Sequence, residues 1–424
     1  MTINQDNPRA FLTYLFTEAV AVADPMRVVA AHLPARPKGR MLVIGAGKAS
    51  ARMAEAVEAH YGPCEGLVIT RYGYERALHS IEIASASHPV PDEAGEHATS
   101  RILDLVSDLT EDDLVIALIS GGGSALLCAP ADGLTLSDKI AVNTALLASG
   151  APIGAMNIVR KHLSRVKGGQ LAAACHPAKL LTLLISDVPG DDPSQIASGP
   201  TVGDDSTPQD ALAVLERYNV PVSASVKMAI ATTSSVVSTT DPRLAHAESR
   251  IIAAPSHSLA AATAIAVAAG LDVRNLGDAL ESEAHDLGAQ QAEIALSLQS
   301  GLTKSDKPIL LLSGGECTVT RRGNGIGGPN AEFVLSAAIT LNGQAGIYVL
   351  ACDTDGVDGA AEVAGAYAAP ETLTLARNKN ADPVAALASN DAHSFFGTIN
   401  SQIVTGPTLT NVNDFRAMLI CPTI

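Results

Sequence analysis

The 424-residue sequence contains no tryptophan, and aromatic residues make up only 3% of it. Proteins that bind single-stranded nucleic acid stack the bases on aromatic side chains, so this composition argues against that class. Charge argues the same way, because 28 lysines and arginines stand against 44 aspartates and glutamates, a net charge of −16. Such a field repels phosphate backbones and anionic lipid. We therefore expect no nucleic-acid partner and no membrane partner.

Long apolar runs and paired cysteines are also missing. No stretch approaches the roughly 18 consecutive apolar residues that a membrane-spanning helix needs. The first residues show neither the basic nor the apolar segment of a signal peptide. The six cysteines form no C-x-x-C pair, which disfavours a zinc knuckle and a disulfide framework. These absences predict a cytoplasmic protein with reduced thiols.

The sequence is rich in residues that build a core. It is 47% hydrophobic and 17% charged, and short aliphatic runs alternate with helical patterns, which is typical of α/β layering with mostly parallel strands. The strands are expected at 40–44, 66–70, 81–85, 114–119 and 179–186. A second series begins near 249 with the run 250–253 and continues with strands at 308–312, 316–320 and 346–351. The helices are expected at 8–33, 48–60, 92–108, 135–149, 154–175, 257–269 and 281–299.

A polar, turn-rich segment at 232–248 is the best candidate for a domain boundary. The chain length, at roughly 100–200 residues per domain, favours more than one domain. We expect two α/β domains, residues 1–240 and residues 241–424. Open α/β sheets place their sites in loops at the carboxyl ends of strands, so functional motifs are expected there.

The first motif, Gly45-Ala46-Gly47-Lys48, follows a strand and opens a helix. Such a turn presents backbone N–H groups to an anion, and a lysine at a helix start is disfavoured unless an anion is near. Walker A spacing is absent, and Ser50 holds the place of the third glycine in a dinucleotide fingerprint. We expect Gly45 and Gly47 to bind a nucleotide and Lys48 to be catalytic. The alternative is a tight turn with a solvated lysine.

The second motif is a run of three glycines between two serines at the end of the strand 114–119. Three glycines let the backbone wrap closely around an anion, and the hydroxyl groups add donors. Apolar segments on both sides disfavour a flexible linker. The expected substrate- or phosphate-binding residues are Ser120, Gly121, Gly122, Gly123 and Ser124.

The third motif is a basic cluster at 157–169, which is unusual in an acidic chain. At helical spacing Arg160 and Lys167 share a face, as do Lys161 and Arg165. Guanidinium and ammonium groups bind phosphate and carboxylate. We expect Arg160, Lys161 and Lys167 to hold the substrate or phosphate anion; the alternative is a solvated helix face.

Carboxylates form the fourth group, because several follow strands next to glycine turns. This placement suits Mg²⁺ that is held partly through waters and substrate phosphates. Asp187 is the expected catalytic residue, as a base or a metal partner. Asp191, Glu316 and Asp353 are the expected metal ligands. For any single acid, an Asp-Gly turn without function is the alternative.

Taken together, the motifs resemble the MOFRL-type glycerate 2-kinases, whose members have often been labelled hydroxypyruvate reductases. The resemblance implies an N-terminal Rossmann-like domain with a largely parallel sheet and a C-terminal MOFRL-type α/β domain. It also implies ATP with Mg²⁺ phosphorylating D-glycerate to 2-phosphoglycerate. Gly314, Gly315 and Asn330 are then expected to bind the nucleotide. The segments that carry the resemblance are 45–50, 87–92, 119–126, 159–169, 186–191, 198–201, 313–316, 353–356 and 405–408.

One position departs from the family pattern. The family commonly has Gly-Gly-Arg-Asn-x-Glu, whereas Pro329 stands here in place of the arginine; Arg321 and Arg322 are the nearby candidates for its role. Two other functions stay open. Gly45-x-Gly47 with Arg71 suggests an NAD(P)H-dependent hydroxypyruvate reductase, and a sugar-acid sensor is a non-enzymatic alternative without a DNA-binding module to support it. The sequence also leaves a homodimer open.

Overall fold

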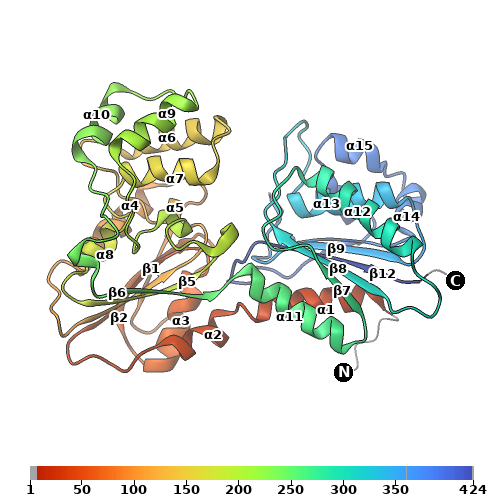
Figure 1. The fold of residues 1–424 in the computed structure, drawn as a ribbon, viewed down its shortest axis with the longest axis horizontal. Helices are drawn as coiled ribbons and strands as arrows, with labels where there is room; N and C mark the ends of the chain where they lie inside the picture. The colour runs from red at the N-terminus through yellow and green to blue at the C-terminus, as the bar shows by residue number, and fades with distance from the viewer. Residues whose placement is uncertain (1–6, 360, 423–424) are drawn as a thin grey trace. The chain divides into compact units, whose positions relative to one another are not determined.

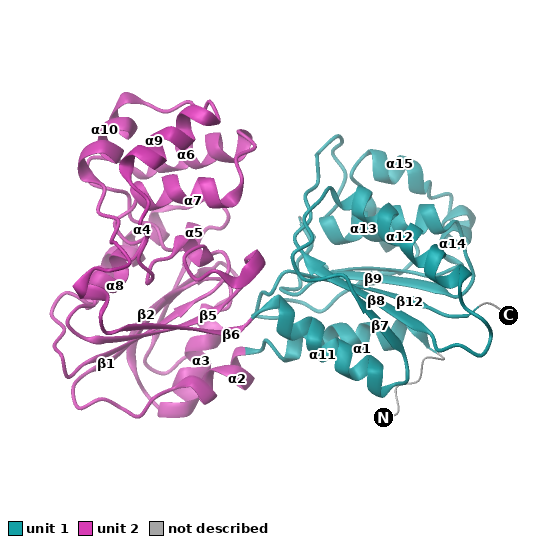
Figure 2. Cartoon of the chain, in the orientation of Figure 1, with its two compact units in different colours: residues 1–24, 254–424 teal, residues 25–253 magenta. Residues whose placement is uncertain are grey.

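The computed structural model describes residues 7–359 and 361–422. The first six residues, which bear on the expected lack of a signal peptide, lie outside that range. The chain divides into two compact units, one of Pro25–Ala253 and one that combines the chain up to Asp24 with Ala254–Ile424 (Figure 2). We call them unit 2 and unit 1, as in Figure 2. The observed limits differ from the expected ranges 1–240 and 241–424, because the chain passes between units at Asp24–Pro25 and at Ala253–Ala254.

Unit 2 is built on a six-stranded parallel sheet in the order β3-β2-β1-β4-β5-β6. The order reverses between β1 and β4, as in Rossmann-like folds. Every residue of β1 and of β4 is buried, which explains their unbroken aliphatic sequences. The strands are β1 (Met41–Ala46), β2 (Glu65–Arg71), β3 (Glu82–Ala86), β4 (Leu114–Ile119), β5 (Lys179–Ile185) and β6 (Ala247–Ala253). The prediction of a parallel N-terminal sheet is confirmed.

The helices of unit 2 cover this sheet and form a small helical layer beyond it (Figure 1). Helices α6, α7, α9 and α10 share an apolar core that includes Val142, Val159 and Leu215. The helices are α2 (Pro25–Val28), α3 (Ser50–Tyr61), α4 (Glu93–Leu105), α5 (Gly123–Leu126), α6 (Leu136–Ala148), α7 (Ile153–His162), α8 (Gln170–Ala174), α9 (Pro208–Arg217) and α10 (Ala224–Thr233). Short 3₁₀ turns are η1 (Val29–His32), η2 (Pro189–Asp191), η3 (Ile196–Ser198) and η4 (Pro242–Leu244).

The segment that we expected to separate the domains lies inside unit 2. The Val237 N–H donates to the Gly168 carbonyl at 3.0 Å. The Asp205 carboxylate accepts hydrogen bonds from the N–H and the hydroxyl of Thr239 at 3.0 and 2.6 Å. Its polar composition therefore serves hydrogen bonds to neighbouring loops, and the segment does not connect the units.

Unit 1 contains a mixed six-stranded sheet in the order β11-β10-β9-β12-β8-β7. Among the described strands of this sheet, β7 and β8 pair in parallel, whereas β12, the last strand, runs antiparallel to both β8 and β9 and β10 runs antiparallel to β9 and β11. The expectation of mostly parallel strands is therefore wrong for this unit. The strands are β7 (Asp272–Asn275), β8 (Ile309–Gly315), β9 (Ile347–Asp353), β10 (Gly365–Ala368), β11 (Gln402–Ile403) and β12 (Asp414–Ile420).

The expected strand at 316–320 does not form. Thr318 makes only an isolated bridge with Glu283. The Thr320 N–H donates to the carboxylate of the same Glu283 at 3.0 Å. A side chain thus accepts the hydrogen bond that the Thr320 N–H would otherwise donate to a neighbouring strand.

Helices cover both faces of the unit 1 sheet, with α1 and α11 on one face and α12 and α13 on the other (Figure 1). Buried side chains of α1, including Phe11, Leu15 and Phe16, pack into the core of this unit, and the ring of Phe16 lies 5.9 Å from that of Phe415. The helices are α1 (Pro8–Ala21), α11 (Pro255–Ala268), α12 (Ala284–Ser300), α13 (Pro329–Leu341), α14 (Thr372–Asn378), α15 (Pro383–Ala388) and α16 (Ala392–Thr398). Among the described residues no helix is long and apolar enough to span a membrane.

Candidate functional site

The loops that follow β1 and β4 emerge side by side, since the sheet register pairs Ala46 with Ile119. The backbone N–H of Lys48 donates to the carbonyl of Gly121 at 2.8 Å. The N–H of Ala49 donates to the Ser120 hydroxyl at 3.0 Å. Open α/β sheets bind ligands where the strand order reverses. The structure therefore brings the first two predicted motifs together at that position.

The glycines of the first motif have a packing role. A Cβ atom at Gly45 would lie 2.3 Å from the Leu118 carbonyl oxygen, and one at Gly47 would lie 2.1 Å from the Ser120 hydroxyl. The N–H groups of Gly47 and Ser50 donate to carbonyl oxygens, like that of Lys48. All four amides from 47 to 50 are thus used within the protein. An anion at this turn would meet the Lys48 side chain instead, and a nucleotide-binding role for Gly45 and Gly47 stays a prediction.

The glycine-rich loop after β4 keeps backbone donors available. Within the part of the chain that the structure describes, the N–H groups of Gly121, Gly122 and Ser124 donate no hydrogen bond. Gly122 has a φ of 82°, and a Cβ atom there would lie 3.1 Å from the His88 ring and 3.2 Å from Cγ of Lys48. The loop therefore offers three amide donors close to a lysine and a histidine.

His88 is a residue that reasoning from single motifs missed. Histidines that lack a metal or catalytic partner in sequence are most often structural, so only the resemblance at 87–92 drew attention to this one. The structure shows that the half-buried His88 ring lies next to the glycine-rich loop, because a Cβ atom on Gly122 would come within 3.1 Å of it.

The loop after β5 supplies the third part of the site. Asp187 follows β5 and is half-buried. Asp191 has a φ of 55°, and among the described residues its buried Oδ1 has no hydrogen-bond partner. Ala197 and Ser198, with φ of 52° and 62°, are also left-handed, and a Cβ atom at Gly123 would lie 2.7 Å from that of Ala197. Left-handed non-glycine residues are costly and cluster at functional sites.

The lysines of the basic cluster at 157–169 do not lie on a solvated helix face, but inside unit 2. Lys161 is 1% exposed and forms an ion pair with Asp204 at 2.5 Å. Lys167 is equally buried, and its ammonium donates to the carbonyl of Leu127 at 3.1 Å. Burial lowers the pKa of Lys167 well below its ordinary value, and the nearby charge of Lys139 acts in the same direction. Lys161 and Lys167 are therefore already partnered inside unit 2.

Arg160 is also held by protein groups. Its guanidinium donates to the side-chain oxygen of Asn143 at 2.8 and 3.0 Å and to that of Asn157 at 3.2 Å. Burial lowers the pKa of Arg160. This arginine orients amides close to the loop after β4, and binding of an anion by Arg160, Lys161 or Lys167 stays a prediction.

In unit 1 most of the predicted residues lie at the carboxyl ends of β8 and β9, and Asn330 lies in the first turn of α13. The register places Asp414 opposite both Gly315 and Asp353. The Asn330 side chain donates to Asp414 at 2.6 Å, and its backbone N–H donates to Asp358 at 3.0 Å. Asn330 is 0% exposed. The sequence had not indicated that Asn330 would belong to a buried polar network.

Charges complete this network. Arg416 forms an ion pair with Asp414 at 2.5 Å, and His393 contacts Asp358 at 2.9 Å. Burial raises the pKa of Asp414 although Arg416 opposes the shift.

Pro329 begins α13, a position where proline suits a helix. Gly314 accepts a hydrogen bond from Arg416 through its carbonyl at 3.1 Å.

The predicted metal ligands are divided between the two units. Asp191 lies in unit 2, whereas Glu316 and Asp353 lie in unit 1. In residues 7–359 and 361–422 no three His, Cys, Asp or Glu side chains are arranged to hold a metal ion. Mg²⁺ usually takes one or two carboxylates and completes its shell with waters and phosphates. The residues present fit a Mg²⁺ that is carried by nucleotide phosphates, and the unpartnered oxygen of Asp191 is suited to it.

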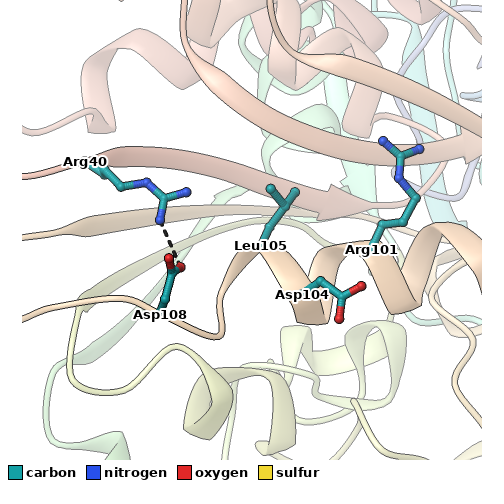
Figure 3. A pocket seen from close by; sticks show the side chains of 5 residues that line it. All are labelled: Arg40, Arg101, Asp104, Leu105 and Asp108. Carbon is teal, nitrogen blue, oxygen red and sulfur yellow. Dashed lines mark hydrogen bonds and ion pairs between the residues drawn. The ribbon is translucent and has the colours of Figure 1, made fainter.

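A pocket is found at the opposite, amino end of the unit 2 sheet (Figure 3). Its arginines already have acidic partners. Arg40 pairs with Glu65 at 2.7 Å and with Asp108 at 3.1 Å, and Arg101 pairs with Glu82 at 2.5 Å. We assign no function to this pocket.

Comparison with known proteins decides the family. Residues 11–231 match a domain of unknown function, DUF4147, and residues 309–414 match the MOFRL family. The D-glycerate 2-kinase of Thermotoga maritima is 39% identical over 406 residues, 95% of this chain and 96% of that protein. The chain belongs to the MOFRL-type glycerate 2-kinase family. The family prediction is thereby confirmed, and the family is one of phosphotransferases that act on an alcohol group.

Solved structures and other relatives add detail. The crystal structure of Thermotoga maritima glycerate kinase has a TM-score of 0.86 and 37% identity, and the match covers 97% of this chain and 99% of that one. This confirms the predicted α/β fold class. A protein of Agrobacterium vitis, 50% identical over 99% of this chain and 96% of its own length, is provisionally named a hydroxypyruvate reductase. Names among the relatives are thus divided.

Proposed function

We propose that this protein phosphorylates the 2-hydroxyl of D-glycerate, with ATP as phosphoryl donor and Mg²⁺ as metal, to give 2-phosphoglycerate. The observation that carries the proposal is the position of Lys48 beside the free amides of Gly121, Gly122 and Ser124, at the reversal point of the sheet. Membership of the kinase family supports it. A cytoplasmic location and the oligomeric state stay predictions from the sequence.

Phosphoryl transfer requires positioning and neutralisation of charge more than covalent chemistry from the protein. Lys48 and the three amides are suited to hold phosphate or carboxylate oxygens. Asp187, at the end of β5, is the proposed base for the reacting hydroxyl. Bound Mg²⁺ would neutralise the nucleotide phosphates, with Asp191 as its proposed protein ligand. Contacts of Gly314, Gly315, Asn330, Glu316 and Asp353 with the Mg-nucleotide remain proposals for unit 1.

The test is an assay of ADP release with a panel of hydroxy acids, with the product examined by phosphorus NMR. We expect ADP to form with D-glycerate, and the new phosphorus signal to couple to the single proton on C2. Absence of ADP release with every hydroxy acid, or phosphorylation at the 3-hydroxyl, would overturn the proposal.

A reductase is the second candidate because relatives carry that name. Binding of a dinucleotide pyrophosphate at the first turn of a Rossmann fold uses amides at the helix start. Here the amides from 47 to 50 are used within the protein, which disfavours this function. Oxidation of NADH or NADPH by hydroxypyruvate, with purified protein and no coupling enzyme, would reverse the ranking.

A further inference from the structure

A chain of hydrogen bonds runs from Arg160 to the glycine-rich loop, and the arginine sets its direction. A guanidinium can only donate, so the Asn157 atom that faces Arg160 at 3.2 Å is the amide oxygen. The amide nitrogen of Asn157 accordingly donates to the side-chain oxygen of Gln195 at 2.9 Å. The orientation of the Asn157 amide is therefore fixed.

This orientation determines where two hydroxyl protons lie. The Ser198 hydroxyl is 3.0 Å from Oδ1 of Asn157, and an amide oxygen can only accept, so Ser198 donates to it. The hydroxyls of Ser124 and Ser198 are 2.8 Å apart. Because Ser198 has already used its single proton, Ser124 donates to Ser198. The Ser124 oxygen is left with its lone pairs, as an acceptor.

Backbone strain supports a functional reason for this arrangement. Ser198 is 0% exposed and has a φ of 62°, in a loop that is held by hydrogen bonds from Gly168 and Gly169 to the carbonyls of Ser198 and Gly199. A buried non-glycine residue keeps such a conformation only when its surroundings enforce it. The loop presents the Ser198 oxygen to Ser124, on the half-buried side of the loop after β4.

The loop thus combines two kinds of hydrogen-bonding groups. Its free amides at Gly121, Gly122 and Ser124 are donors that suit an anion. The Ser124 oxygen is an acceptor, which suits a hydroxyl group and repels a carboxylate or phosphate oxygen. This combination matches a hydroxy acid better than a phosphate alone.

We infer that Ser124 accepts a hydrogen bond from the 3-hydroxyl of the substrate, the hydroxyl that is not phosphorylated, and that Ser198 is the positioning residue that makes Ser124 an acceptor. The inference rests on the proposed function. It changes the predicted role of Ser124, which was that of a donor to an anion.

The 3-hydroxyl is favoured over the reacting hydroxyl by the chemistry of the chain. The reacting hydroxyl group must lose a proton during transfer. The hydrogen-bond chain that starts at Ser124 continues through the Ser198 hydroxyl and the Asn157 amide oxygen to the Arg160 guanidinium. None of these groups takes up a proton near neutral pH. Ser124 can therefore bind and select, and deprotonation falls to another residue.

The test compares D-glycerate with D-lactate, which has the same carboxylate and 2-hydroxyl but a methyl group in place of the hydroxymethyl group. Dissociation constants are measured by calorimetry with Mg²⁺ and a non-hydrolysable ATP analogue, and KM and inhibition constants by ADP release. For Ser124→Ala we expect roughly tenfold weaker binding of D-glycerate, because a hydrogen bond is lost. Binding of D-lactate should change less than about twofold, because it lacks the hydroxyl.

Ser198→Ala distinguishes positioning from a purely structural role. The Ser124 proton loses its acceptor and turns toward the ligand, so D-glycerate should bind several-fold more weakly while D-lactate is retained. A structural defect would weaken both ligands. Ser107→Ala, an exposed serine whose hydroxyl donates to the Asp104 carbonyl, is the matched control and should leave both constants unchanged.

The deciding quantity is the ratio of the dissociation constants of D-lactate and D-glycerate. Each outcome is decisive because this ratio does not depend on the fraction of a variant that is correctly folded. Equal weakening of both ligands, or a raised KM for Mg-ATP alone, would mean that Ser124 binds an anion and would overturn the inference. Unchanged selectivity would overturn it too, and turnover of D-glycerate by the wild type would then leave the proposed function standing. If the wild type binds neither acid, both proposals fail. If the wild type binds D-glycerate but does not phosphorylate it, the proposed function fails, and the binding constants of the variants still test the role of Ser124.

Discussion

Lys48 lies directly at the candidate site. Its backbone N–H donates to the carbonyl of Gly121, and its Cγ atom lies beside Gly122. Lys48→Ala should lower kcat by roughly 10²–10³-fold, the scale seen when a preorganised electrostatic donor is lost. The free energy of unfolding should change by only about 0.5 kcal/mol. Steady-state kinetics and urea unfolding measure the two effects.

Two variants make this prediction specific. Lys48→Arg should restore little activity, because a guanidinium is broader than an ammonium and donates in a different geometry. Lys38→Ala changes an exposed lysine outside the site and should keep full turnover. Near wild-type kcat in Lys48→Ala would reduce the lysine to a solvated turn residue.

Gly122 allows a comparison in which backbone strain is held constant. Gly122 and Gly133 have φ of 82° and 83°, but a Cβ atom at Gly133 would meet nothing within 4 Å. Substitution by alanine should cost each variant roughly 1–2 kcal/mol for the left-handed conformation. Only Gly122→Ala should lower kcat/KM, by more than about tenfold, because its Cβ displaces Lys48 and His88. Equal kcat/KM values in the two variants would show that the loop that contains Gly122 does not belong to the site.

The Lys161–Asp204 ion pair predicts a dependence of stability on pH. Burial is the largest influence on the pKa of Asp204 and raises it, but hydrogen bonds from Lys161 and Ser206 outweigh it and the net pKa is lowered. The stability from this carboxylate is therefore complete above the unfolded pKa near about 4 and is lost as the pH falls through the lower folded pKa. Urea unfolding between pH 6 and pH 3 measures the loss.

Variants of the same pair separate its charges. Asp204→Asn leaves a buried ammonium without a carboxylate and should cost about 3–5 kcal/mol at neutral pH. Its stability should also fall less steeply than that of the wild type below about pH 4. Lys161→Met combined with Asp204→Asn should recover most of the loss. A double variant as unstable as the single one would show that the pair is not the cause.

The sequence indicated which residues meet at the site better than it indicated what each does. Lys48 and the loop after β4 could be placed together, because parallel strands align their carboxyl ends. The roles of Lys161 and Lys167 could not be predicted, since a basic run has the same spacing whether its charges face solvent, Asp204 or buried carbonyl groups. The resemblance marked the segments that contain His88 and Ser198, but their contacts with the loop after β4 come from the tertiary structure.

At the scale of elements, five of the six strands of unit 2 were predicted closely. The reason is clearest for β1 and β4, because buried parallel strands are unbroken aliphatic runs. The run at 250–253 was expected to open the second series, but it forms β6 of unit 2. Two predicted helices were too long. The expected helix 8–33 ends at Ala21 and a new turn begins at Pro25, since proline disfavours the helical conformation of the residue before it. The expected helix 154–175 ends at His162, and a short helix begins again only at Gln170, directly after Gly168 and Gly169, which have φ of 58° and 77°. Mixed pairing in unit 1 depends on where β12 inserts, which periodicity does not encode.

Helix α1 gives a prediction at this scale. Phe16 is 1% exposed and packs against Phe415 of β12. Phe16→Ala should destabilise unit 1 by about 3–5 kcal/mol. Hydrogen exchange of the full chain should then accelerate in α1, β9 and β12. Thr17→Ala, at an exposed position on the same helix, is the control and should change stability by only about 0.5 kcal/mol. Uniform acceleration in both units would contradict the assignment of α1 to unit 1.

For the whole molecule, the main consequence of the fold is that one unit is continuous in sequence and the other is not. Unit 2 is the single segment Pro25–Ala253, whereas unit 1 combines α1 with the chain from Ala254 onward. The core of unit 1 includes Leu12 and Phe16 of α1 together with Leu310 and Phe415 of the sheet. A fragment of residues 241–424, cut at the boundary expected from the sequence, would lack this helix.

The two units should therefore behave differently when they are expressed alone. Residues 25–253 should fold cooperatively, because the sheet and its own apolar clusters lie within that segment. Residues 254–424 should be unstable, because the surface that α1 covers would expose apolar side chains to water. Adding a peptide of residues 1–24, or joining it to the fragment through a flexible linker, should restore a sharp thermal transition. The same peptide with Leu12 and Phe16 changed to alanine should not restore it. Cooperative unfolding of 254–424 without any peptide would show that α1 contributes little to this unit, and circular dichroism with a thermal scan distinguishes the two results.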